Sequence, residues 1–255
     1  MPHKVPRYGW VADLPDQRDF RYAAARATVE RLPPRVDLTA QCPAVYDQGQ
    51  LGSCTANAIG AAFEFEQDKQ NRPADFMPSR LFIYYNERLI ENTVGSDSGA
   101  QIRDGMKSVN QQGVCPESQW PYDIARFTQK PADSCYQTAQ EHQVVSYHRV
   151  SRDVAQMKGC LAEGYPFVLG FTVYESFESP EVARTGILNL PARTEKEVGG
   201  HAVMAVGYDD AQGRFRIRNS WGTAWGLAGY FTMPYQYLLD ENLSDDFWTI
   251  RLVEA

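Results

Sequence analysis

The most specific segment of this 255-residue chain is Asn219-Ser-Trp-Gly-Thr-Ala-Trp-Gly226. In it tryptophans alternate with glycines directly after a short apolar run, and glycine permits the tight backbone turns that such a pattern needs. Alone, the segment would be read as a β-bend with aromatic packing. Two other segments suggest that it belongs to a catalytic site: one ends at Cys54, and the other contains His201 near its start.

The segment Gln48-Gly-Gln-Leu-Gly-Ser-Cys54 precedes a run whose apolar spacing predicts a helix over 54–69. A cysteine in the first turn of a helix lies near unpaired amide groups and the positive end of the helix dipole, which favour the thiolate. An isolated cysteine of this kind is more often a buried, inert thiol. Cys54 is therefore a candidate nucleophile only if a base accompanies it.

The segment Gly199-Gly-His201-Ala-Val-Met-Ala-Val-Gly-Tyr208 places a histidine at the start of an apolar strand. Alone, such a histidine is more often structural than catalytic. A nucleophilic thiol needs a base, however, and the base needs a third group that orients its ring. Cys54, His201 and Asn219 can supply these roles, with His201 147 residues and Asn219 165 residues after Cys54.

These three segments and their spacing resemble the papain/cathepsin-like cysteine peptidases over about 33–253. The segment ending at Cys54 resembles the nucleophile loop of that family, the one at His201 its histidine strand, and the one at Asn219 its asparagine turn. Residues 33–38 resemble the start of a mature enzyme. A short leader before that start is similar to the layout of some bacterial members. The resemblance implies no cofactor and no metal.

The resemblance implies a role for each matched residue. Cys54 would be the nucleophile, His201 the general base and then the acid, and Asn219 the residue that orients His201. Gln48 and the Cys54 amide would form an oxyanion hole, in which each donor lowers the barrier by roughly 3–4 kcal/mol. Trp221 would shield the His201–Asn219 hydrogen bond from water. The reaction would be hydrolysis of protein or peptide substrates through a thioester acyl-enzyme.

The resemblance also suggests where a substrate backbone would bind. The segment Gly95-Ser-Asp-Ser-Gly99 matches the family's glycine-rich stretch, to which an extended peptide adds as a strand. Gly99 is the candidate there, and Gly52 is its counterpart near the scissile bond. Three further positions would lie near the pocket for the residue two before the cut: Gly170, Gly200 and Ala202. The alternative is that these are ordinary turn glycines.

The chain departs from the family's local signature, C-G-[SA]-C-[WY], at two places. Leu51 replaces the first cysteine, and Ser96 stands where its disulfide partner is expected, so both halves of that bridge are missing together. Thr55 replaces the aromatic residue after the nucleophile, which changes the packing of the cleft but not the chemistry.

The cysteine count is odd, so at least one thiol has no partner within the chain, and Cys54 is the candidate. Cys135 stands at a family disulfide position whose usual partner is absent, and Cys115 is a possible substitute. Cys42 and Cys160 would then be free or paired with each other. Five reduced thiols are the alternative.

The chain reads as a run of helices followed by a run of strands, which predicts an α+β fold. Helices are expected over 54–69, 79–91, 101–112 and 152–163, and strands over 167–174, 201–208, 214–219, 229–233 and 246–253. By the resemblance, the papain-like catalytic domain spans 32–255. It would have a helical lobe over about 40–143, an antiparallel β-rich lobe over about 144–255, and the active-site cleft between them.

Composition excludes several classes of function. Apolar residues make up 43% and charged residues 22%, as in ordinary globular proteins. A net charge of −7 argues against nucleic acid as the main partner. No apolar run approaches the ~20 residues that span a bilayer, and no signal peptide is visible. We expect a monomer with no membrane contact, and the resemblance leaves a secreted or periplasmic location open.

Residues 1–31 form a leader with a different charge from the rest. They carry six basic and four acidic residues, net +2, whereas the remainder carries net −9. Opposite charge favours docking, and the leader is rich in aromatic residues such as Tyr8 and Trp10. Because such peptidases are commonly made latent by an N-terminal segment, we expect a zymogen whose leader covers part of the cleft. The alternative is a frayed or surface-packed extension.

Two other functions remain open at the level of sequence. One is a binding protein built on an inactive papain-like fold, although such proteins usually lack the nucleophile or the histidine, and Cys54, His201, Asn219 and Gln48 are all present here. The other is acyl transfer from the same thioester to an amine, as in a transpeptidase or ligase.

Overall fold

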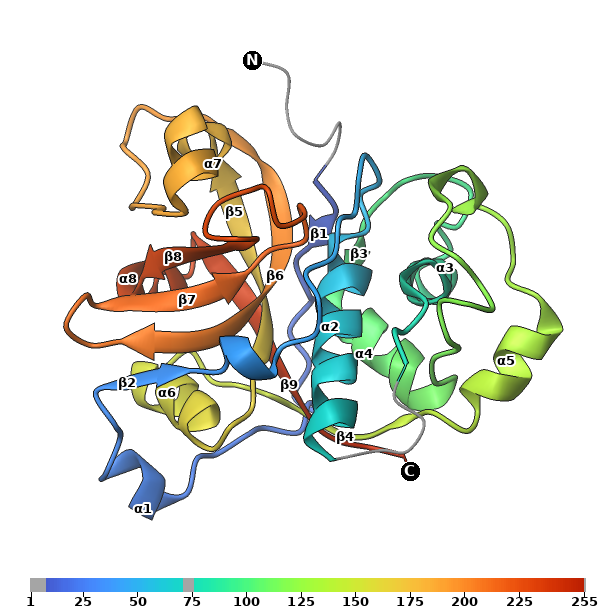
Figure 1. Cartoon of the computed structure of the whole chain (residues 1–255), viewed down its shortest axis with the longest axis horizontal. Helices are drawn as coiled ribbons and strands as arrows, with labels where there is room; N and C mark the ends of the chain where they lie inside the picture. Colours follow the sequence, from blue (N-terminus) through green and yellow to red (C-terminus); the bar gives the residue numbers. More distant parts are fainter. Residues whose placement is uncertain (1–7, 71–75, 255) are drawn as a thin grey trace.

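Helix α2 (Cys54–Lys69) forms the centre of the molecule in the computed structural model, which describes residues 8–70 and 76–254. It stands between a β-rich lobe and a helical lobe (Figure 1). Nearly all of its residues are buried, because it contacts β6 and β9 on one side and α3 and α4 on the other. Its many alanines allow these neighbours to approach closely, as dense packing requires.

The helical lobe contains three further helices: α3 (Arg80–Ile90), α4 (Ile102–Gln111) and α5 (Asp133–Ala139). Helix α3 begins after Ser79, whose Oγ accepts a 3.1 Å hydrogen bond from the Phe82 amide. A cap of this kind typically stabilises a helix by ~1 kcal/mol. The predicted helices over 54–69, 79–91 and 101–112 match α2, α3 and α4 to within one residue at each end.

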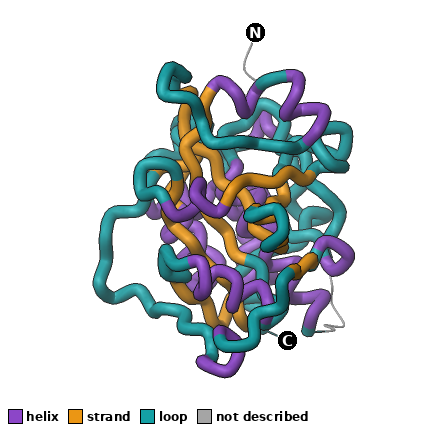
Figure 2. Tube along the Cα trace, turned by 90° about the vertical axis from the view of Figure 1, so that its left-hand side faces the viewer, coloured by secondary structure: helices purple, strands orange, loops and turns teal. Residues whose placement is uncertain are grey.

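The β-rich lobe contains a seven-stranded antiparallel sheet. Along its main path the order is β4 (Val144–Arg149), β9 (Ser244–Val253), β5 (Phe167–Tyr174), β6 (Glu197–Asp209), β7 (Arg214–Arg218) and β8 (Tyr230–Pro234). Strand β2 (Arg35–Asp37) pairs with β6. Seen from the β-rich side, the strands cross the molecule, with short helices and loops around them (Figure 2).

Short elements complete the fold. The α-helices are α6 (Val154–Ala162), α7 (Pro180–Thr185) and α8 (Tyr235–Leu239), and the 3₁₀ helices are η1 (Thr39–Gln41), η2 (Ile124–Arg126) and η3 (Glu175–Glu178). The α+β fold with two lobes is confirmed. Strand β6 begins four residues earlier than predicted, because its glycines at 199 and 200 pair with Val173 and Thr172 of β5.

The N-terminal leader runs between the two lobes. Strand β1 (Trp10–Val11) pairs in parallel with β3 (Ala100–Gln101), and both lie beside α2 (Figure 1). Further along, Tyr22 is buried in the core and its amide donates a 2.9 Å hydrogen bond to the Arg149 carbonyl. Helix α1 (Arg26–Val29) follows and has no buried residue. The leader is therefore packed against the body along much of its length.

All five cysteines are free thiols, so the structure does not contain a Cys115–Cys135 bridge. Both thiols are buried, and burial together with the neighbouring Cys135 thiol raises the pKa of Cys115. Across the described residues no helix is both long and apolar enough to cross a membrane.

Candidate active site

Cys54 is the first residue of α2 and is completely buried. Burial raises the pKa of its thiol to about 12. Hydrogen bonds from the backbone amides of Ala202, Gly9 and Thr55 to the sulfur act in the opposite direction. Two of these donors come from other segments: Ala202 from β6 and Gly9 from the leader. The sulfur therefore lies where the two lobes and the leader meet.

His201 precedes Ala202 on β6 and is also completely buried. Its Nε2 lies 2.8 Å from Oδ1 of Asn219. Burial lowers the pKa of the imidazole to about 4, and the bond to Asn219 opposes that shift. The Nδ1 atom has no hydrogen-bond partner among the described residues. This nitrogen is therefore available to a group at the cleft, while Nε2 is occupied.

Asn219 follows β7 directly, and its amide is fixed by a 3.0 Å hydrogen bond to the Gly229 carbonyl. Its Oδ1 also accepts the Ser220 amide at 2.8 Å, which sets the plane of the side chain. The ring of Trp221 lies 5.2 Å from that of His201, inclined by 30°, and is only 2% exposed. The indole therefore helps to exclude water from the His201–Asn219 bond.

Gln48 is buried and tied to the same turn. Its Oε1 accepts a 2.7 Å hydrogen bond from the Ser220 hydroxyl, and its Nε2 donates to the Leu51 carbonyl at 2.9 Å. A primary amide has two N–H donors, so one remains for a group in the cleft. The structure thus brings together all four predicted catalytic residues: Cys54, His201, Asn219 and Gln48.

Comparison with known proteins agrees with this geometry. The sequence pattern of the papain family cysteine proteases matches residues 32–238, most of the chain. The chain belongs to the papain family of cysteine proteases.

Two relatives resemble this papain-family protease over nearly its whole length. The crystal structure of xylellain, a cysteine protease from Xylella fastidiosa, is 46% identical, has a TM-score of 0.91, and covers 100% of this chain and 98% of its own. A peptidase C1-like protein of Acanthamoeba polyphaga mimivirus is 44% identical over 96% of this chain and 87% of its own. Procathepsin L 3 of Tenebrio molitor, at 18% identity and a TM-score of 0.67 over 89% of this chain and 73% of its own, shares the fold.

The leader of this papain-family protease crosses the cleft beside Cys54. The Gly9 carbonyl accepts the Ala100 amide at 2.8 Å. A Cβ atom on Gly9 would lie 1.7 Å from the Gly52 carbonyl oxygen, and one on Gly99 would lie 2.1 Å from the Gly9 oxygen. The positive φ of Gly99, 72°, also favours glycine. Gly52 and Gly99, both predicted to contact a substrate backbone, lie against the leader backbone in this structure.

The side chains on either side of Gly9 fill the cleft. A Cβ atom on Gly170 would lie 1.9 Å from the Trp10 ring, and one on Gly200 would lie 2.6 Å from it. The Tyr8 ring packs edge-on at 5.7 Å from His201, and its hydroxyl donates to Glu178. The predicted substrate-binding residues therefore line the path that the leader takes: Gly52, Gly99, Gly200, Ala202 and Trp221, with Gly170 beside them.

Two acidic residues of this site were not predicted. Asp97 accepts the Gly52 amide at 3.0 Å and the Tyr84 hydroxyl, so it fixes the loop before Cys54. Its position between two glycines of the 95–99 segment was a usable signal. Asp246 is buried under Trp10 and has a positive φ of 60°. Nothing in the sequence around Asp246 distinguishes it from a residue of an ordinary turn.

Proposed function

We propose that this protease hydrolyses peptide bonds through a thioester on Cys54, and that its leader holds the enzyme latent by occupying the cleft. One observation carries both parts. The backbone amides of Ala202, the residue after His201, and of Gly9 in the leader both lie close enough to the Cys54 thiol to lower its pKa. The leader therefore sits on the atom that would attack the substrate.

The proposed reaction follows from the hydrogen bonds of His201. If Nε2–H donates to Asn219 Oδ1, then Nδ1 carries the lone pair and accepts the thiol proton of Cys54. The thiolate attacks the carbonyl carbon, and the oxyanion accepts hydrogen bonds from the Cys54 amide and the remaining Gln48 N–H. His201 then gives its proton to the departing amine. It next takes a proton from a water molecule whose oxygen attacks the acyl carbon. The C–S bond then breaks, the carboxylic acid product leaves, and His201 returns the proton to the Cys54 sulfur.

Latency has two physical causes in this proposal. The leader excludes substrate, because Tyr8, Gly9 and Trp10 occupy the space beside Cys54. It also excludes water, and burial holds the thiol pKa near 12 and the imidazole pKa near 4. Both groups are then neutral at pH 7, and a thiol is a far weaker nucleophile than a thiolate. Departure of the leader would expose Cys54 and His201 to water again, which favours their charged forms, a thiolate beside an imidazolium.

The leader is anchored beyond the cleft, and this allows a selective truncation. Asp13 accepts the Trp248 indole N–H at 3.0 Å, and Asp19 forms a 2.7 Å ion pair with Arg103. Tyr22 is part of the core. Removing residues 1–31 would therefore damage packing, whereas removing residues 1–11 empties the cleft and keeps these anchors.

The test compares kcat/KM on a small peptide substrate for the full chain and for the 12–255 variant. We expect the truncation to raise kcat/KM, and Cys54→Ala or His201→Ala in the truncated protein to abolish turnover. Cys42→Ala, which removes a thiol elsewhere, is the matched control. Equal activity of the full and truncated proteins would contradict the latency proposal but not the proposed reaction. Turnover that survives Cys54→Ala would contradict the proposed nucleophile.

A further inference from the structure

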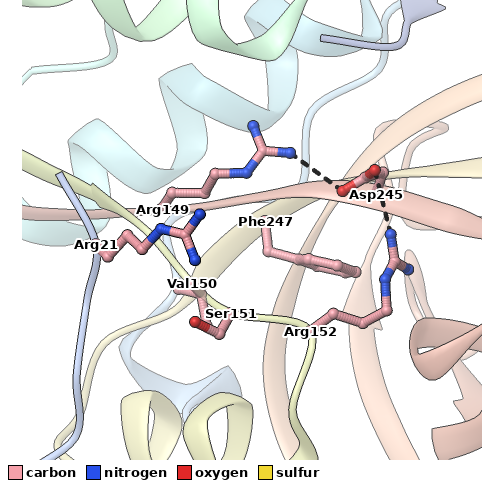
Figure 3. Close-up of a pocket in the computed structure, with 7 residues that line it drawn as sticks. All are labelled: Arg21, Arg149, Val150, Ser151, Arg152, Asp245 and Phe247. Carbon is pink, nitrogen blue, oxygen red and sulfur yellow. Dashed lines mark hydrogen bonds and ion pairs between the residues drawn. The ribbon is translucent and has the colours of Figure 1, made fainter. Parts of the chain in front are cut away.

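A cavity of about 190 Å³ lies outside the catalytic site, between the leader and the β-rich lobe. Three arginines from different segments meet there (Figure 3). One is in the leader, one ends β4, and one precedes α6. The lining includes Arg21, Arg149, Arg152, Ser151, Asp245 and Phe247.

The positive charge of this cavity exceeds its negative charge. Asp245 is the one carboxylate in its lining, and it pairs with Arg149 at 3.1 Å and with Arg152 at 3.2 Å (Figure 3). Arg149 is also committed to buried carboxylates, including Asp246 at 2.8 Å. Arg21 has neither an ion pair nor a side-chain hydrogen bond with any described residue. Arg149 and Arg152 are thus neutralised by described carboxylates, and Arg21, which is exposed, is the cation at this cavity that no described carboxylate neutralises.

The available donors fit a tetrahedral oxyanion. All five N–H donors of Arg21 are free of described partners, and Ser151 supplies a hydroxyl. Arg152 lies against the Phe247 ring at 5.3 Å, and its Nη1 donates to the Leu238 and Ser244 carbonyls, so its guanidinium is fixed at the cavity wall. Its Nε–H has no described acceptor and is the donor that Arg152 can offer to a ligand. Guanidinium groups bind phosphate through paired N–H donors. We propose that this cavity is a binding site for a phosphate group, held between Arg21 of the leader and Arg152 of the body.

The position of the cavity would couple this ligand to the leader. Arg149 forms backbone hydrogen bonds with the leader on both sides of Arg21: its amide donates to the Phe20 carbonyl at 2.8 Å, and its carbonyl accepts the Tyr22 amide at 2.9 Å. A ligand that contacts both Arg21 and Arg152 binds the docked leader better than the released one, and so stabilises docking. Inhibition of the protease by phosphate would follow, and that consequence rests on the proposed function.

Binding is tested by calorimetric titration of the full chain carrying Cys54→Ala, at constant ionic strength set with sodium chloride. The probes are inorganic phosphate, pyrophosphate and glycerol 3-phosphate. We expect saturable binding of one equivalent. Preference for inorganic phosphate or pyrophosphate would identify free phosphates as the ligand, and preference for glycerol 3-phosphate a phosphomonoester. Absence of saturable binding for all three probes would overturn the proposal.

Charge variants distinguish a site from general attraction. Arg21→Gln should weaken binding at least fivefold, whereas Arg31→Gln removes the same charge from the same leader, away from the cavity, and should have no effect. Asp245→Asn removes the competing carboxylate and should tighten binding. Equal weakening by Arg21→Gln and Arg31→Gln would overturn the site.

Hydrogen exchange gives a readout that does not depend on peptidase activity. The Tyr22 and Arg149 amides form two of the hydrogen bonds that join leader and body, on either side of Arg21, so a ligand bound there should slow their exchange severalfold. Slower exchange without inhibition would support the phosphate site and contradict the latency proposal. Unchanged exchange at saturating ligand would overturn the coupling.

Discussion

The indole Nε1 of Trp10 donates a 3.0 Å hydrogen bond to Oδ2 of Asp246, which joins the leader to the last strand of the sheet. The same oxygen accepts the Asp13 amide at 2.8 Å, and Oδ1 pairs with Arg149 at 2.8 Å. A buried carboxylate is costly unless it is paired. Here the leader and the body each supply part of that pairing, so Asp246 is fully satisfied only when the leader is docked.

The first prediction concerns Trp10. Trp10→Ala removes the ring that packs on Gly170 and Gly200 as well as the hydrogen bond to Asp246. Truncation of a buried aromatic residue costs about 3–5 kcal/mol in a core, and this indole is partly buried. We expect kcat/KM of the full chain to rise at least tenfold, because the leader leaves the cleft more often. Trp10→Phe, which keeps a ring, should give an intermediate value.

The control for Trp10→Ala is another leader aromatic. Phe20 is 77% exposed, so Phe20→Ala should leave kcat/KM unchanged. If the two variants raised activity equally, loosening the leader anywhere would suffice, and the role assigned to the Trp10–Asp246 contact would be wrong.

The second prediction concerns the pH dependence of Cys54 alkylation. In the docked state burial raises the thiol pKa to about 12, so little thiolate exists at neutral pH. Its fraction should grow about tenfold per pH unit, without reaching a plateau by pH 10. In the 12–255 variant the rehydrated thiol should pair with His201, and the rate should already level off near neutrality. Iodoacetamide labelling followed by peptide mass mapping gives both profiles.

His201→Ala in the 12–255 variant serves as the control for this profile. Without the imidazole the thiol should titrate near its ordinary pKa of about 8.5, so the plateau should move to higher pH. A full-length chain that is alkylated as fast as the truncated one at pH 7 would show that the leader does not shield the sulfur.

Sequence reasoning could select the candidate catalytic residues because three of them lie in or directly beside a regular element. Cys54 begins a helix, His201 lies within an apolar strand, and Asn219 directly follows another strand. Such positions leave periodic and compositional signals that one sequence can reveal. The long helices and most strands were predictable for the same reason. The predicted strand over 246–253 began two residues late, because β9 starts at Ser244.

The missing parts depend on contacts that are distant in sequence. Strand β4 was not predicted because its residues are mostly half-exposed and it is ordered by pairing with β9. The role of Asp246 depends on Trp10, 236 positions away. Charge asymmetry predicted that the leader would dock, but it could not identify Gly9 as the residue on Cys54. That assignment rests on the close approach of Gly9 to the Gly52 carbonyl oxygen, which depends on how the two segments pack in the folded chain.

The third prediction concerns Asn219. Its Oδ1 is the hydrogen-bond partner of His201 Nε2 at 2.8 Å, so Asn219→Ala should allow the ring to rotate and lose its fixed tautomer. General acid–base catalysis typically contributes 10²–10⁴-fold, and we expect kcat in the 12–255 variant to fall at least tenfold with little change in KM. Asn242→Ala, at an exposed position, is the control. A change confined to KM would contradict a positioning role.

The fourth prediction tests why the leader can lie so close to Cys54. A Cβ atom on Gly9 would lie 1.7 Å from the Gly52 carbonyl oxygen, which is backbone and has little freedom to move. Gly9→Ala should therefore expel the leader from the cleft while its anchors from Asp13 onward hold. The full-length variant should reach the kcat/KM of the 12–255 protein, with an unchanged thermal midpoint for the body. Leu14→Ala, at a side chain that is 73% exposed, is the control and should remain latent. If Gly9→Ala stayed as latent as the wild type, the leader would not owe its position over Cys54 to the missing side chain, and another contact would have to hold it there.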